Sequence, residues 1–187
     1  MGMPAESTQA HLELDELTLR RAQRGEPGAQ QAFVETYQRL VFRLISRVLL
    51  RADPSSIEDA AQETFLAALK ALPGFRTGAN AKLSTWLGTI AVRRAIDMAR
   101  RRRVEAGKAR ITAVDEGMVP PNWQAVALSR AMASLAPDVR AAFVLRELEG
   151  YSYEEIAAAL AIPIGTVKSR LARARDALRI QLQEGAP

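Results

Sequence analysis

Apolar residues return every three or four positions along most of this chain, and that spacing is the period of an α-helix. The longest such stripe is formed by Phe33, Tyr37, Leu40, Val41, Leu44, Ile45 and Val48. Gly and Pro clusters interrupt the pattern, and no alternating run indicates a strand. The sequence therefore predicts an all-α fold.

The breaks divide the chain into two small helical domains. We expect a disordered N-terminus at residues 1–11, a first domain at 12–103 and a second domain at 123–187. Residues 104–122 contain two Gly and two Pro and lack sustained periodicity, so they are predicted to be a flexible linker.

Residues that favour helix ends predict several boundaries. Ser55 with Glu58 is expected to form a capping box at the start of a helix that runs to Leu72, and Ser84 is expected to cap a helix at about 85–103. In the second domain, helices are expected at about 123–134, 138–149, 153–160 and 164–183.

The chain lacks the residues that most catalytic and metal sites require. Its 187 residues include no Cys and one His, His11, which excludes disulfides and thiolate sites and disfavours a histidine metal site. No phosphate-binding glycine loop and no nucleophile paired with a base is present, so we expect no metal, no cofactor and no enzyme activity. No stretch is apolar for long enough to span a bilayer, and a cytoplasmic protein without membrane insertion is expected.

Two helices joined by a tight turn are predicted near the C-terminus. Ser152 and Glu155 fit a capping box, and residues 161–163 make the turn. In the second helix, one narrow inner stripe contains Val167, Leu171, Ala174 and Leu178. The opposite face contains Ser169, flanked by Thr166, Ala172 and Arg173, with Lys168 and Arg170 on the shoulders.

Small polar groups between cations are what entry into the major groove of duplex DNA requires. The net charge of +5 is compatible with such a partner. A solvated basic helix in an ordinary three-helix bundle would show the same pattern.

The helix predicted at 55–72 has two different faces. Its core side contains Ile57, Ala61, Phe65, Ala68 and Leu72. Its outer side contains Asp59, Gln62, Glu63 and Leu66. A leucine among acidic and polar groups suits an interface with a basic protein, while a solvated acidic face with one stray leucine is the alternative.

The next helix combines an aromatic residue with cations. Trp86 lies near its start, and Arg93 and further arginines follow. A single-stranded nucleic acid could stack on the tryptophan while the arginines neutralise its phosphates. For Trp86 itself, we expect most of the ring to pack in the core.

These segments, in this order, resemble the sigma-70 family of bacterial transcription initiation factors, in its extracytoplasmic-function (ECF) type. The matching segments are residues 59–66 for family region 2.2, Phe75 and residues 84–97 for regions 2.3 and 2.4, and residues 135–157 and 163–171 for region 4. The resemblance covers about residues 14–103 and 123–181.

The resemblance implies a partner for each surface. The face with Asp59, Gln62, Glu63 and Leu66 would bind the beta-prime clamp helices of core RNA polymerase, and the second domain its beta flap. Phe75, Trp86 and Arg93 would act at the promoter −10 element, where the loop from Phe75 to Thr85 would receive a flipped base. The residues implied at the −35 element are Arg146, Lys168, Ser169 and Arg173. An anti-sigma factor is a further implied partner.

Two positions depart from the family pattern. Arg93 stands where asparagine is frequent, and Ala172 replaces a bulkier residue of some relatives. Two other functions are alternatives: a helix-turn-helix regulator that binds duplex DNA without polymerase, and an interaction protein such as an anti-sigma factor or an adaptor. The first function does not require the outer face with Leu66. The second does not require the basic face around Ser169 and Arg173.

Overall fold

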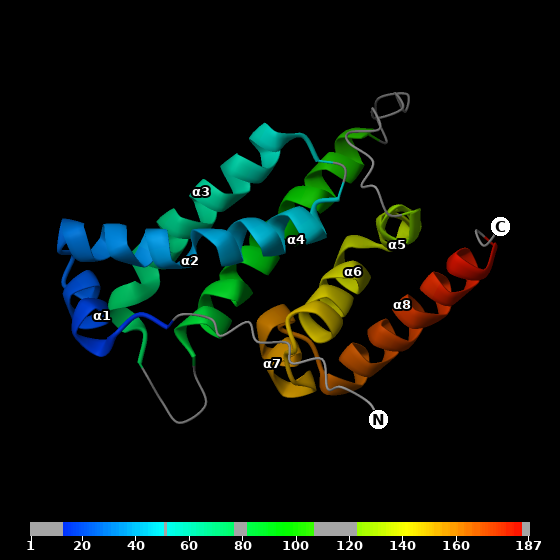
Figure 1. The fold of residues 1–187 in the computed structure, drawn as a ribbon. Coiled ribbons are helices and arrows are strands. Elements are labelled where there is room, and N and C mark those ends of the chain that lie inside the picture. The colour runs from blue at the N-terminus through cyan, green and yellow to red at the C-terminus, as the bar shows by residue number, and fades with distance from the viewer. Residues whose placement is uncertain (1–12, 51, 77–81, 107–122, 185–187) are drawn as a thin grey trace, which may run out of the picture.

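The computed structural model describes residues 13–50, 52–76, 82–106 and 123–184, and every regular element in them is helical. The first domain contains α1 (Glu16–Gln23), α2 (Pro27–Val48), α3 (Pro54–Ala71), the 3-10 turn η1 (Leu72–Gly74) and α4 (Leu83–Ala106). The second contains α5 (Trp123–Ser134), α6 (Pro137–Phe143), the π-helical segment η2 (Val144–Leu148), α7 (Tyr153–Leu160) and α8 (Ile164–Glu184). The predicted all-α architecture of two small domains is confirmed (Figure 1).

The first domain is built around α2. This helix contacts α1, α3 and α4, and all seven apolar residues of its predicted stripe are buried. Phe33 lies at the centre, with its ring 5.3 Å from that of Tyr37 and 6.3 Å from that of Phe65. An apolar stripe at helical spacing thus becomes a core because three neighbouring helices cover it.

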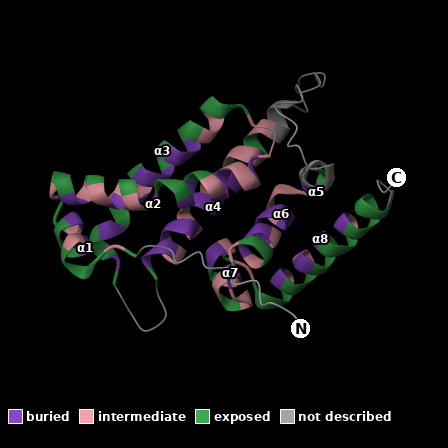
Figure 2. Ribbon diagram, in the orientation of Figure 1, coloured by how far each residue is buried: buried purple, intermediate pink, exposed green. Residues whose placement is uncertain are grey.

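The second domain is built around α8, which packs against α5, α6 and α7. Its predicted inner stripe of Val167, Leu171, Ala174 and Leu178 is buried. The rest of the helix is largely exposed, so α8 presents a long outer face to solvent (Figure 2).

The turn between α7 and α8 forms as the sequence predicts. The Ser152 hydroxyl accepts a hydrogen bond from the Glu155 amide at 3.0 Å, and the Glu155 carboxylate accepts one from the Ser152 amide at 2.7 Å. At the other end of α7, Ala161 adopts a left-handed conformation with φ of 53°. That residue ends the helix and redirects the chain into α8.

Two predicted helix caps are wrong. Asp53 caps α3 in place of the Ser55–Glu58 box, because its carboxylate accepts hydrogen bonds from the Ser56 amide and from both serine hydroxyls. These bonds, with the one from Ser55 first, lower the pKa of Asp53. Ser84 does not cap α4 but lies within its first turn, buried, and its hydroxyl bonds to the Glu13 carboxylate. The helical segment expected at about 138–149 is present as α6 followed directly by η2, so that only its last part, Val144–Leu148, is π-helical.

The predicted linker begins later than residue 104, since α4 continues to Ala106. Residues 107–122 of that linker lie outside the described residues, as does the N-terminus predicted to be disordered at 1–11.

The two domains lie against each other. Helix α4 contacts α6 and α7, and α2 contacts α6 and η2 (Figure 1). The buried residues of both domains form one continuous cluster. We call this the closed arrangement.

Replacing Ser152 by Ala should remove about 1 kcal/mol from the free energy of unfolding, because one amide at the start of α7 loses its acceptor. Urea denaturation followed by circular dichroism measures this. Ser129→Ala, at an exposed position inside α5, is the control and should change stability by less than about 0.5 kcal/mol. Equal stabilities for the two variants would contradict a role for the cap.

Candidate functional site

The outer face of α3 is exposed and has mixed chemistry. Asp59, Gln62, Glu63 and Leu66 all face solvent, and the Leu66 side chain is 70% exposed. Its sequence neighbour Phe65 is buried with Ala61 and Ala68 on the opposite side of the helix. The expected division of α3 into a core side and an outer side is therefore confirmed, and we call the four exposed residues the α3 face.

The aromatic pair of the first domain lies where η1 meets the start of α4. The rings of Phe75 and Trp86 are 5.1 Å apart and tilted by 46°. Phe75 is buried and Trp86 is half-buried against the core. The chain between them includes residues 77–81, so most of the loop expected to receive a base lies outside the described residues.

Arg93 reaches from α4 to the second domain. Its Nε donates to the Ala159 carbonyl at 2.6 Å, and its Nη2 donates to the Ala158 carbonyl at 2.7 Å. Both carbonyls belong to the last turn of α7, and the Ala158 carbonyl also accepts a hydrogen bond from the Ala161 amide at 3.3 Å. A guanidinium at this end also complements the helix dipole.

The outer face of α8 has the predicted arrangement of small and basic groups. Lys168, Ser169 and Arg173 are exposed. The Arg173 Nε is 3.4 Å from the Ser169 carbonyl one turn earlier, so that the side chain lies along the helix. Arg170 differs from the expectation, because it forms an ion pair with Asp138 of α6 at 2.8 Å and its side chain is only 15% exposed.

Arg146 packs against the start of α7. Its Nη1 donates to the Tyr151 carbonyl at 2.8 Å, and its guanidinium lies 5.0 Å from the centre of the Tyr153 ring. These contacts fix Arg146 beside the helix-turn-helix, while Lys168, Ser169 and Arg173 share the outer face of α8.

An ion cluster between the domains was not predicted. Arg43 bonds to both carboxylate oxygens of Glu149 at 3.1 Å, and Arg47 bonds to one of them at 2.6 Å. The Glu149 side chain has no exposed surface. The two arginines are four positions apart on α2, which places them on one helix face. That spacing was the only signal in the sequence, and it does not identify a partner about 100 residues away.

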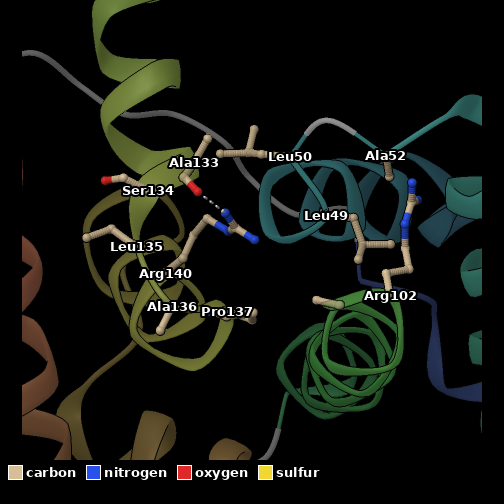
Figure 3. Close-up of a pocket in the computed structure, with 11 residues that line it drawn as sticks. Leu49, Leu50, Ala52, Arg102, Ala133, Ser134, Leu135, Ala136, Pro137 and Arg140 are labelled. Carbon is tan, nitrogen blue, oxygen red and sulfur yellow. Dashed lines mark hydrogen bonds between the residues drawn. The ribbon is translucent and has the colours of Figure 1, made fainter. Parts of the chain in front are cut away.

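A cavity of about 270 Å³ also lies between the domains (Figure 3). Arg140 of α6 extends into this region from one side, and Leu49 and Leu50 line the other. Arg140 is 94% buried; its Nη1 lies 3.3 Å from the Met132 carbonyl and 3.4 Å from that of Ala133, at the end of α5. Burial lowers the pKa of Arg140.

The described residues contain no cluster of His, Asp and Glu side chains that could hold a metal ion. Within the same residues, none of the helices has the length and apolar character needed to cross a membrane.

Two family models match the chain. The one described as Sigma-70 region 2 covers residues 33–105, and the one described as Sigma-70, region 4 covers residues 125–178. The chain is 34% identical to the ECF RNA polymerase sigma-E factor of Escherichia coli (strain K12), over 90% of this chain and 94% of that protein. It is 35% identical to the RNA polymerase sigma-H factor of Pseudomonas aeruginosa, over 91% of this chain and 95% of that protein.

Two solved structures share the fold. One is the sigma factor RpoE in complex with the anti-sigma factor NepR from Bartonella quintana, with a TM-score of 0.64 and 25% identity over 83% of this chain and 99% of that chain. The other is CnrH in complex with the cytosolic domain of CnrY, with a TM-score of 0.62 and 22% identity over 91% of this chain and 97% of that chain.

The two sides of α3 should respond differently to substitution. Phe65→Ala should lower the free energy of unfolding by about 3 kcal/mol, because it empties a core position. Leu66→Glu should change it by less than about 0.5 kcal/mol, because the side chain is already in water. Urea denaturation of both variants measures the contrast, and a large loss for Leu66→Glu would show that this residue packs inside the protein.

Proposed function

This chain belongs to the ECF group of the sigma-70 family of RNA polymerase sigma factors, and we propose that its two domains bind different targets at a promoter. The observation that carries this proposal is the pair of exposed faces with opposite chemistry. The α3 face is acidic around one leucine, and the outer face of α8 is basic around one serine.

The α3 face is the proposed binding surface for the beta-prime clamp helices of core RNA polymerase. Leu66 supplies an apolar anchor, and Asp59 and Glu63 supply charges for a basic partner. The second domain is proposed to bind the beta flap of the same enzyme. A dimeric regulator of duplex DNA would have no use for the α3 face.

The region around Phe75, Trp86 and Arg93 is proposed to act at the −10 element. Phe75 packs against the Trp86 ring, and Trp86 is only partly buried, so that part of its side chain is available for stacking. Arg93 supplies donors for phosphate or a base. A factor that binds the opened strand better than the duplex shifts the equilibrium toward opening without hydrolysing ATP.

The outer face of α8 is proposed to bind the −35 element in the major groove. Lys168 and Arg173 reach phosphate or guanine, and Ser169 permits a close approach. Arg146 is proposed to contact the −35 element as well. Its guanidinium stacks on the ring of Tyr153, which holds it at the start of α7.

The chain is proposed to catalyse nothing itself and to act in the cytoplasm, where the polymerase carries out the chemistry. An anti-sigma factor is a proposed further partner. Support for it comes from the RpoE–NepR complex, whose sigma factor has the same fold.

Replacing Leu66 by Arg should weaken binding to core RNA polymerase by at least about 2 kcal/mol, because it replaces the apolar anchor with a charge that a basic partner repels. Leu17→Arg on α1 is a matched control, since Leu17 is 67% exposed and lies outside the α3 face. Titration of labelled variants with core polymerase measures both affinities. Equal affinities would rule out the α3 face as the docking surface.

Arg173→Ala should cost about 1–3 kcal/mol of discrimination between a preferred and a scrambled −35 sequence if the guanidinium reads a base. The measurement is initiation from the two promoters by the polymerase bearing each variant. Lys168→Ala provides the comparison, since the loss of a phosphate contact should lower initiation from both promoters equally. A uniform loss for Arg173→Ala would assign that residue to phosphate as well.

A further inference from the structure

Arg140 of α6 is a buried cation, and its hydrogen bonds within the described residues go only to backbone carbonyls. Its side chain is 94% buried, and its Nη1 lies 3.3 Å from the Met132 carbonyl and 3.4 Å from that of Ala133. Both distances exceed the usual range of about 2.7–3.2 Å for an N–H···O hydrogen bond. A carbonyl carries no net charge, so these contacts leave the positive charge of Arg140 without a counterion.

One nitrogen of Arg140 has no partner among the described residues. Its Nε is buried and donates no hydrogen bond to them. Burial lowers the pKa of Arg140, and no carboxylate of the described residues raises it again. Because an arginine keeps its proton in a protein, the charge remains. A buried donor and a buried charge are thus both unsatisfied, and each costs free energy.

The Arg140 guanidinium extends into the cavity of about 270 Å³ between the domains, and Arg102 of α4 lines the same cavity (Figure 3). The Arg102 Nη1 is also buried without a hydrogen bond, although it forms an ion pair at 3.2 Å with Asp53. The described residues that line the cavity include these two arginines and no acidic residue. With Asp53 counted against Arg102, one positive charge is left in excess.

Water satisfies only part of what this cavity requires. The cavity has room for several water molecules, since each occupies about 30 Å³ in the liquid. A water molecule would accept a hydrogen bond from Nε but would leave the charge of Arg140 unbalanced. An anion would accept the hydrogen bond and balance the charge, and such charge-assisted bonds are about twice as strong as neutral ones.

The size of the cavity and its donors indicate which anion fits. Pockets for drug-sized ligands measure about 300–1,000 Å³, so this smaller cavity suits a compact ion. The planar guanidinium group matches the oxygens of phosphate. Leu49, Leu50 and Ala99 form apolar parts of the wall. An apolar wall lowers the local dielectric constant, which strengthens the pairing of an anion with the two arginines.

We propose that Arg140 and Arg102 form a binding site for a phosphate group in this cavity. The Nε of Arg140 donates to a phosphate oxygen, and Arg102 supplies a second positive charge. The ligand is either free phosphate or the phosphate group of a small metabolite. The site does not rest on the proposed function, because neither arginine belongs to the α3 face or to the outer face of α8.

The Nε–H signal of Arg140 in nuclear magnetic resonance spectra tests the site directly. The full-length chain is prepared with isotope-labelled arginine, and the Arg140 signal is identified by its absence from Arg140→Lys. Inorganic phosphate is then titrated at constant ionic strength, with chloride as the balancing anion. We expect a saturable shift of the Arg140 signal, because Nε gains an acceptor. A signal that stays in place throughout the titration would overturn the site.

Calorimetric titration with inorganic phosphate tests the two arginines separately. Arg140→Lys keeps the charge but removes Nε and the planar group, and it should weaken binding on the order of 10-fold. Arg102→Gln removes the second charge at a partly exposed position and should also weaken binding. Arg39→Gln, an exposed arginine of α2 outside the cavity, is the matched control and should leave binding unchanged.

Circular dichroism establishes that each variant is folded before its affinity is compared. If Arg140→Lys does not fold, Arg102→Gln still decides the question, because its side chain is not part of the buried core. Phosphate affinity equal to that of the unchanged chain in every folded cavity variant would overturn the proposal, since phosphate would then bind elsewhere on this basic protein.

A second ligand distinguishes the two sources of the phosphate group. Inorganic phosphate and glycerol phosphate are titrated in parallel into the unchanged chain and into Arg102→Gln. Binding of both, weakened in Arg102→Gln, supports the site and assigns it to the phosphate group of a metabolite. Binding of inorganic phosphate alone, weakened in the same variant, supports a site for the free ion. Binding of neither would overturn the proposal.

Discussion

The arrangement of the two domains depends on the ion pairs that the Glu149 carboxylate forms with Arg43 and Arg47. A charged group without access to water must have partners, and Arg43 and Arg47 of the other domain are among them. Tyr151, two residues later, consequently lies over Gly88, and α7 presents its last carbonyls to Arg93. Electrostatic pairing, helix capping and close packing all favour the same domain arrangement.

The helices also determine what remains available to partners. Each long helix has one apolar side, and the closed arrangement covers those sides while leaving the α3 face and the outer face of α8 in water (Figure 2). An acidic face with a leucine and a basic face with a serine suit a protein and DNA respectively. The membership of the chain in the sigma-70 family gives these faces a common context, initiation of transcription.

Local features were predictable from the sequence, and distant contacts were not. The capping box at Ser152 and the buried stripe from Val167 to Leu178 depend on residues a few positions apart, and both are confirmed. The cap predicted at Ser84 is wrong, because the Ser84 hydroxyl bonds to Glu13, which is 71 positions away in the chain. The exposure of Leu66 followed from helical periodicity. The partner of Glu149 did not, because no periodic pattern encodes a contact between domains.

Run-off transcription tests the central claim most directly. Purified chain and core RNA polymerase would be incubated with nucleotides and a library of bacterial promoter fragments, and the RNA start sites would be mapped. The account predicts transcripts from defined start sites only when chain and core polymerase are both present, with shared sequences near −10 and −35. No specific start site on any template, together with no association between the chain and core polymerase, would contradict it.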